Sequence, residues 1–151
     1  MSAESDLDRL LRGMRPKLQD GTYLFCTIPG GAPPDGLKPL ATFREAEGLT
    51  LVLSTEEAER RGILGTFEAA WITLTVDSDL AAVGFLAAVA TALAEEGIPC
   101  NAIAAYHHDH LFVPKAMAEQ AMTTFVRLQE FARRLPRRSG TREFEVGDQQ
   151  D

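Results

Sequence analysis

The 151-residue chain is poor in the residues that mark several classes of protein. It has two cysteines, three histidines and one tryptophan, and its 15 Lys and Arg residues are outnumbered by 22 Asp and Glu residues. The net charge of −7 argues against a nucleic-acid binder, because phosphate recognition depends on clustered Lys and Arg side chains. The same charge provides no attraction to an anionic membrane surface. We therefore expect neither a nucleic acid nor a membrane among the partners.

We also expect no secretory segment and no membrane-spanning helix. The longest apolar stretch, residues 80–94, has about 15 residues, whereas a helix that crosses a bilayer needs about 20. Cys26 and Cys100 lie in predicted strands among apolar neighbours, which indicates buried, reduced thiols and no disulfide. Together these features predict a cytoplasmic protein.

The most informative part of the sequence is the stretch of residues 71–114. Residues 71–76 alternate apolar side chains with threonine, which is the period of a strand. Residues 80–94 have helical spacing, with a cap expected among residues 77–79 and an end at Gly97. The positions expected to face the core are Leu80, Val83, Leu86, Ala87, Ala90, Leu93 and Ala94. A second apolar line, expected to meet the other half or another subunit, consists of Phe85, Val89 and Ala92.

Shorter elements surround this helix on both sides. The sequence after it predicts strands at 98–106 and 108–113 and a long helix at 115–135. The sequence before it predicts a helix at 7–14, strands at 22–28, 40–46 and 49–53, and a helix at 55–61. We expect an N-terminal half at 1–65, a C-terminal half at 66–135, and a tail at 136–151 with an edge strand at 141–146.

Several motifs carry a family resemblance. Leu-Ala-Ala-Val-Gly at 80–84, Leu-Ala-Ala-Val at 86–89 and Leu-Ala-Glu-Glu-Gly-Ile at 93–98 resemble the ACT domain, a small ligand-sensing module attached to enzymes of amino-acid metabolism. Residues 98–114, and more weakly residues 43–50, resemble a group of free-standing bacterial proteins made of two ACT-like halves.

The resemblance covers about residues 5–131 and carries expectations about the fold. It implies an α+β protein of two ferredoxin-like halves, with antiparallel sheets and helices packed on one face. We also expect a homodimer, because open sheet edges and apolar helix faces need covering, and we expect no cofactor. One departure is Ser78-Asp79, which stands where many ACT domains carry proline and glycine.

The resemblance further implies a non-catalytic regulatory protein that binds a small molecule, most characteristically an amino acid. The first N–H groups of a helix have no intrahelical partner, and with the helix dipole they favour a carboxylate. In related ACT domains the effector lies between the loop before this helix and the second strand of a paired domain. Carried onto this sequence, the resemblance implies ligand contacts at Asp79, Leu80, Val83, Gly84, Asn101 and Ile103. Two of these residues have an alternative structural interpretation: Gly84 could allow close packing of the helix, and Asn101 could form a hydrogen bond at a strand edge.

The histidines support an alternative function. All three lie in His107-His108-Asp109-His110, and in a strand His108 and His110 would point to one side, roughly 7 Å apart. Such imidazoles could share a zinc or nickel ion with Asp109 or another carboxylate, as in a metal-binding protein or metal-dependent enzyme. A polar turn, a direct ligand contact and a proton-linked switch are the other interpretations. No other group suggests a nucleophile or an acid–base pair, so we expect no catalysis.

Overall fold

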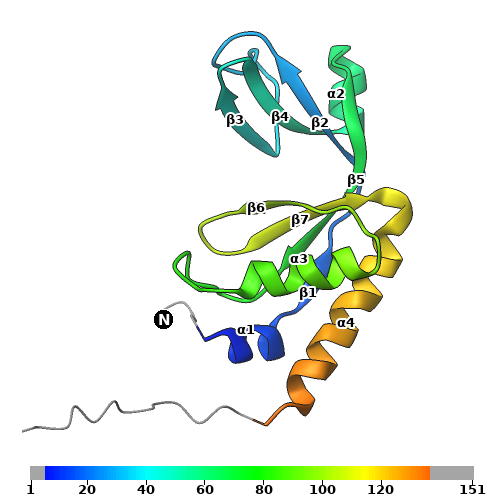
Figure 1. Cartoon of the computed structure of the whole chain (residues 1–151). Helices are drawn as coiled ribbons and strands as arrows, with labels where there is room; N and C mark the ends of the chain where they lie inside the picture. Colours follow the sequence, from blue (N-terminus) through cyan, green and yellow to red (C-terminus); the bar gives the residue numbers. More distant parts are fainter. Residues whose placement is uncertain (1–5, 137–151) are drawn as a thin grey trace, which may run out of the picture.

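The structure is a computed structural model, and it describes residues 6–136. The described elements, in chain order, are α1 (Leu7–Gly13), β1 (Pro16–Leu18), β2 (Tyr23–Ile28), β3 (Ala41–Glu45), β4 (Gly48–Ser54), α2 (Thr55–Arg61), β5 (Gly65–Leu74), α3 (Phe85–Glu95), β6 (Asn101–Ala104), β7 (Asp109–Pro114), the 3-10 helix η1 (Lys115–Met117) and α4 (Ala118–Arg134). The strands form one seven-stranded sheet in the order β3-β4-β2-β5-β7-β6, with β1 paired to β5 (Figure 1). Every strand pair is antiparallel. The strand predicted at 141–146 lies outside the described residues.

β5 is common to both parts of the sheet. Its first residues pair with β2, where Gly65 lies opposite Cys26 and Ala69 opposite Tyr23. Its later residues pair with β7 on one side and with β1 on the other. In Figure 1 this strand runs from the part that holds β2, β3, β4 and α2 into the part that holds α3, β6, β7 and α4. One strand therefore joins the two halves through its backbone hydrogen bonds.

All the helices lie on one face of the sheet because side chains alternate along each strand. In β4, the leucines at 49, 51 and 53 pack with Ala58 of α2. In β5, the residues at 70, 72 and 74 pack against α3 and α4. The opposite face has a smaller apolar cluster whose buried members are Val52, Ala69 and Phe112. The predicted α+β class, with antiparallel pairing and helices on one face, is confirmed.

α1 and the residue that follows it pack in the second half of the molecule. Leu10 and Met14 lie in the same core cluster as Phe125 of α4. The side chain of Gln129 donates hydrogen bonds to the carbonyl oxygens of Arg12 and Met14, over 2.9 and 2.6 Å. β1, which the sequence did not reveal, adds its three residues beside β5. The division of the chain at residue 65 stays a prediction.

Local signals placed α2 correctly. The hydroxyl oxygen of Ser54 accepts a hydrogen bond from the N–H of Glu57 over 3.2 Å, which caps the first turn. Gly62 ends the helix in the left-handed conformation, and its N–H returns to the carbonyl oxygens of Ala58 and Glu59. The predicted helix at 55–61 is confirmed because both of its ends are encoded within a few residues.

The predicted start of the main helix is wrong. The Asp79 carboxylate accepts from the N–H of Ala81 over 2.8 Å, so it closes a local turn and caps no helix. Gly84 then has a φ of +89°, which a right-handed helix cannot include, and α3 begins at Phe85. The buried residues of α3 are Phe85 and Val89, which belong to the other line of the pattern, and Leu93, which was predicted to face the core. Within residues 6–136, no helix is both long and apolar enough to cross a membrane.

We predict that Gly65→Ala destabilises the protein, because residues of β2 leave no room for a Cβ at this position. A Cβ at Gly65 would lie 2.7 Å from Cys26 Sγ and 2.8 Å from Leu24 Cβ. Overpacking of this kind costs about 1–3 kcal/mol of the free energy of unfolding, which urea denaturation measures. Gly31→Ala is the matched control, since no heavy atom lies within 4 Å of its Cβ position. Equal stability of the two variants would contradict the close packing of β2 on β5.

Candidate functional site

A cavity lies between the start of α3 and the start of β7, on the helix-covered face of the sheet. Its volume is about 160 Å³, similar to cavities of about 150 Å³ that hold one benzene-sized molecule. The residues that line it are Ser78, Asp79, Leu80, Ala82, Phe85, Leu86, Ala104 and Asp109. It therefore combines the loop before α3 with the end of β6 and the start of β7.

The start of α3 contributes hydrogen-bond donors to this cavity. Gly84 stands at the N-cap and has no side chain to accept from the first turn, and no other described side chain caps it. The first N–H groups of a helix have no intrahelical acceptor, and they form the positive end of the helix dipole. Phe85 and Leu86, the first two residues of α3, both line the cavity. This end of the cavity is suited to an anionic group.

Asp109 contributes the opposite charge. Only 8% of the surface of Asp109 is exposed, and its carboxylate accepts a hydrogen bond from the Ser78 hydroxyl over 3.4 Å. Burial raises the pKa of Asp109, while the Ser78 hydrogen bond and the charges of His110 and His108 act in the opposite direction. A buried carboxylate with one long hydrogen bond is incompletely compensated, so it favours a cationic group in the cavity. The cavity is complementary to a small molecule that carries both charges.

The structure brings together some of the residues predicted as ligand contacts and separates others. Asp79 and Leu80 line the cavity, and Gly84 begins the helix beside it. Val83 lies in the same loop, with 84% of its surface exposed. Asn101 and Ile103 lie on the other face of the sheet, and both belong to the edge strand β6. The strand register explains this, because it pairs Ala102 with Leu111 and Ala104 with Asp109, so that these alanines lie on the helix-covered face.

Sequence reasoning missed the roles of Ser78 and Asp109 in this cavity. Ser78 was assigned to a possible helix cap, and Asp109 to a possible metal site. A signal for Asp109 was present in the sequence, because it alternates with Leu111 and Val113 along β7. A carboxylate in register with core residues is rarely without a functional or structural reason. The contact between Ser78 and Asp109 joins residues 31 positions apart, and no local pattern predicts it.

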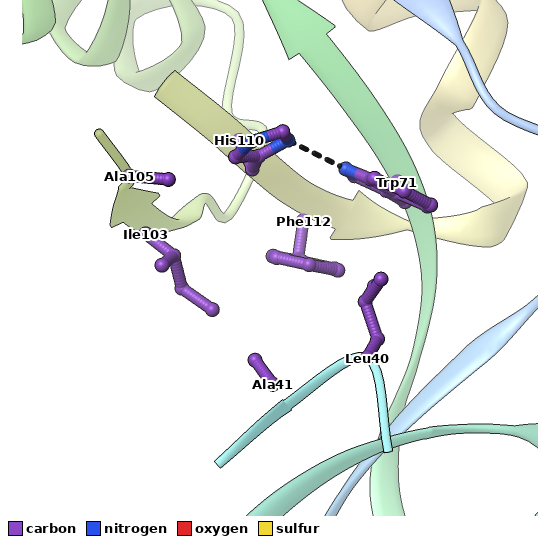
Figure 2. A pocket seen from close by; sticks show the side chains of 7 residues that line it. All are labelled: Leu40, Ala41, Trp71, Ile103, Ala105, His110 and Phe112. Atoms are coloured by element: carbon purple, nitrogen blue, oxygen red, sulfur yellow. Dashed lines mark hydrogen bonds between the residues drawn. The ribbon is translucent and has the colours of Figure 1, made fainter. Parts of the chain in front are cut away.

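The histidines do not converge on a metal site. The indole N–H of Trp71 donates to Nδ1 of His110 over 3.0 Å (Figure 2), whereas Nδ1 of His108 lies 3.1 Å from the carbonyl oxygen of Val76 and donates to it. Burial lowers the pKa of His110, with a further contribution from His108 and an opposing one from Asp109. Across residues 6–136, no three His, Cys, Asp or Glu side chains are grouped so that they could hold a metal ion. The metal-site hypothesis therefore has no support in this geometry.

Comparisons with known proteins agree with the fold. The profile of one ACT domain matches residues 2–70, and the profile of another matches residues 66–126. VC0802 from Vibrio cholerae, a protein of unknown function described as a possible transport protein, is 50% identical to this chain. Its crystal structure aligns with a TM-score of 0.74 over 82% of this chain and 95% of its own. No functionally curated protein sequence matches the chain.

More distant structures share the fold alone. A protein from Agrobacterium tumefaciens is 17% identical and aligns with a TM-score of 0.62 over 77% of this chain and 89% of its own. The ligand-free regulatory subunit of aspartate kinase from Thermus thermophilus is 11% identical, with a TM-score of 0.52 over 75% of this chain and 95% of its own. With two consecutive family matches and a half-identical relative, the chain belongs to the ACT-domain family and carries two ACT domains in tandem.

Proposed function

We propose that this chain is a non-catalytic regulatory protein that binds a free amino acid in the cavity at the start of α3. The observation that carries the proposal is the pairing of an uncapped helix start with the buried carboxylate of Asp109 in one small cavity. The N–H groups of α3 suit the carboxylate of an amino acid, and Asp109 suits its ammonium group. The cavity volume of about 160 Å³ limits the ligand to a small molecule.

The family supports a regulatory role. ACT domains are regulatory modules, and the structures that share this fold include the regulatory subunit of an aspartate kinase. By this analogy the bound amino acid alters how the chain contacts a partner enzyme. We further propose that the protein works in the cytoplasm. Cys26 and Cys100 are free thiols, and burial raises the pKa of both, which keeps them protonated and unreactive there.

We also propose that a second copy of the chain covers the mouth of the cavity. Leu80 lines the cavity and Val83 lies in the same loop, with 65% and 84% of their surfaces exposed, so both can gain from burial in a homodimer. β6 is an edge strand with free backbone groups, which favour pairing with another strand. In such a pair, Asn101 and Ile103 of one copy approach the loop of the other.

Amino-acid binding is tested by thermal shift and calorimetry with each of the twenty amino acids. We expect at least one to stabilise the folded protein, by about 2.7 kcal/mol at a concentration one hundred times its Kd. For that amino acid, the amine without the carboxylate and the acid without the ammonium group should both fail to bind. Absence of binding by all twenty would remove the proposal.

The role of Asp109 is tested by Asp109→Asn. At pH 7 the neutral amide avoids the cost of a buried charge and can still accept from Ser78, so the ligand-free variant should gain about 1 kcal/mol in the free energy of unfolding. Because folding raises the pKa of Asp109, its cost is present at high pH and disappears as pH falls through that pKa, so the two stability curves should converge in acid.

The same variant should lose amino-acid binding, because the ammonium group loses its partner. Asp77→Asn is the matched control, since it makes the same charge change at an exposed residue outside the cavity lining. Retained binding in Asp109→Asn would show that the ligand takes another site or orientation.

Dimerisation is tested by Val83→Glu. A charge at this position should raise the dimer dissociation constant at least tenfold in sedimentation velocity, without loss of thermal stability in the monomer. Leu64→Glu is the control, because Leu64 is 92% exposed but lies away from the loop before α3. A wild-type chain that stays monomeric at all concentrations, or an equal effect of both variants, would contradict the proposed interface.

A further inference from the structure

A second cavity lies on the open face of the sheet, opposite the helices. Its volume is about 230 Å³, which exceeds the volume of about 150 Å³ that accommodates a benzene ring. Figure 2 shows the side chains that surround it, with Leu40 and Ala41 facing Ile103 across the space. The lining residues are Leu40, Ala41, Trp71, Ile103, Ala105, His110 and Phe112.

The curvature of the sheet creates this cavity. β3 and β6 are at opposite ends of the strand order, yet Ala41 of β3 and Ile103 of β6 line the same space. The sheet must therefore curl so that its two edges approach across the open face. The floor is part of the apolar cluster that includes the buried ring of Phe112. An occupant of this cavity would touch both halves of the molecule at once.

His110 supplies the polar group of the cavity, and its neighbours fix its tautomer. The Trp71 indole nitrogen can only donate, so Nδ1 of His110 is the acceptor and the proton of the neutral ring lies on Nε2. The Thr73 hydroxyl lies 3.1 Å from the same Nδ1. That hydroxyl accepts from the side-chain amide of Gln19 over 3.0 Å, which leaves its own proton to be donated to Nδ1. Two donors therefore converge on one nitrogen.

The Nε2–H group of His110 remains available for a ligand. Within the part of the chain that the structure describes, Nε2 has no hydrogen-bond partner, and no unsatisfied polar side-chain atom is fully buried. Burial lowers the pKa of His110, which favours the neutral ring at pH 7. None of the other six lining side chains carries a charge. The cavity offers a single uncharged donor in otherwise apolar surroundings.

We infer that this cavity binds an uncharged, largely apolar ring compound whose carbonyl oxygen accepts a hydrogen bond from Nε2 of His110. An ionised ligand is disfavoured, because the lining holds no group of opposite charge and burial of an unpaired ion is costly. A purely apolar ligand would fill the space but leave the Nε2 donor unsatisfied. The site is separate from the cavity proposed for an amino acid, which lies on the other face of the sheet.

Acetophenone and ethylbenzene provide a matched pair of probes, because they share a phenyl ring and a two-carbon substituent and differ in the carbonyl group. Trp71 is the only tryptophan of the sequence, so its indole N–H gives one resolved signal in a ¹H–¹⁵N spectrum of the full chain. We expect acetophenone to shift this signal saturably at millimolar concentration. Ethylbenzene should bind about tenfold more weakly, the factor for one net hydrogen bond.

Two variants test the assignment. His110→Leu should weaken acetophenone about tenfold and leave ethylbenzene unchanged or tighter, while His107→Leu, at an exposed neighbour outside the lining, should change neither. Ala105→Phe, which fills the cavity, should abolish the shift by both probes. Absence of a saturable shift in the wild type, or equal acetophenone affinity in His110→Leu, would overturn the inference. If His110→Leu fails to fold, binding of either probe by Ala105→Phe is by itself enough to overturn the inference.

Discussion

The backbone hydrogen bonds of β5 are the constraint on which the rest of the structure depends. This strand pairs with β2 over its first residues and with β7 and β1 over its later ones. Buried backbone groups must be paired, so the halves cannot separate without exposing or orphaning the N–H and C=O groups of this strand. The small residues of β5 also hold the two halves together, because they let other parts of the chain pack closely against this strand. Gly65 leaves room for Cys26 and Leu24, and Ala69 is a buried member of the cluster on the open face.

The alternation of side chains along β7 separates two kinds of chemistry. Asp109 lies on the helix-covered face with Leu111, where it meets the start of α3. His110 and Phe112 lie on the open face, where the surroundings are apolar. The two cavities therefore differ in character for a simple geometric reason. On one face, the start of α3 supplies a partial positive charge and Asp109 supplies a full negative charge. On the other face, the neutral imidazole of His110 supplies a single hydrogen-bond donor.

The sequence predicted best where structure is encoded locally. Ser54 and Gly62 mark both ends of α2, and the helix was predicted with its observed bounds because such residue types favour helix ends. The start of α3 was misplaced because residues 80–84 have the composition of a helix, whereas Gly84 adopts a positive φ that only the folded loop reveals. β1 could not be predicted, since three residues gain their strand conformation from pairing with a segment more than fifty positions away. Likewise, the face of the sheet on which each residue of β6 lies could not be predicted until its register with β7 was known.

Consecutive residues of β7 connect the two cavities electrostatically. The negative charge of Asp109 favours protonation of His110, which opposes the effect of burial on the pKa of that histidine. An ammonium group bound beside Asp109 would offset this charge and lower the pKa of His110 further. The ring would then remain neutral over a wider pH range, with Nδ1 free to accept from Trp71 and the proton held on Nε2. Conversely, protonation of His110 places a hydrogen on Nδ1, so the ring can no longer accept from Trp71 and Thr73. A charge placed on one face of the sheet thus alters the hydrogen-bonding capacity of the other through a single peptide unit.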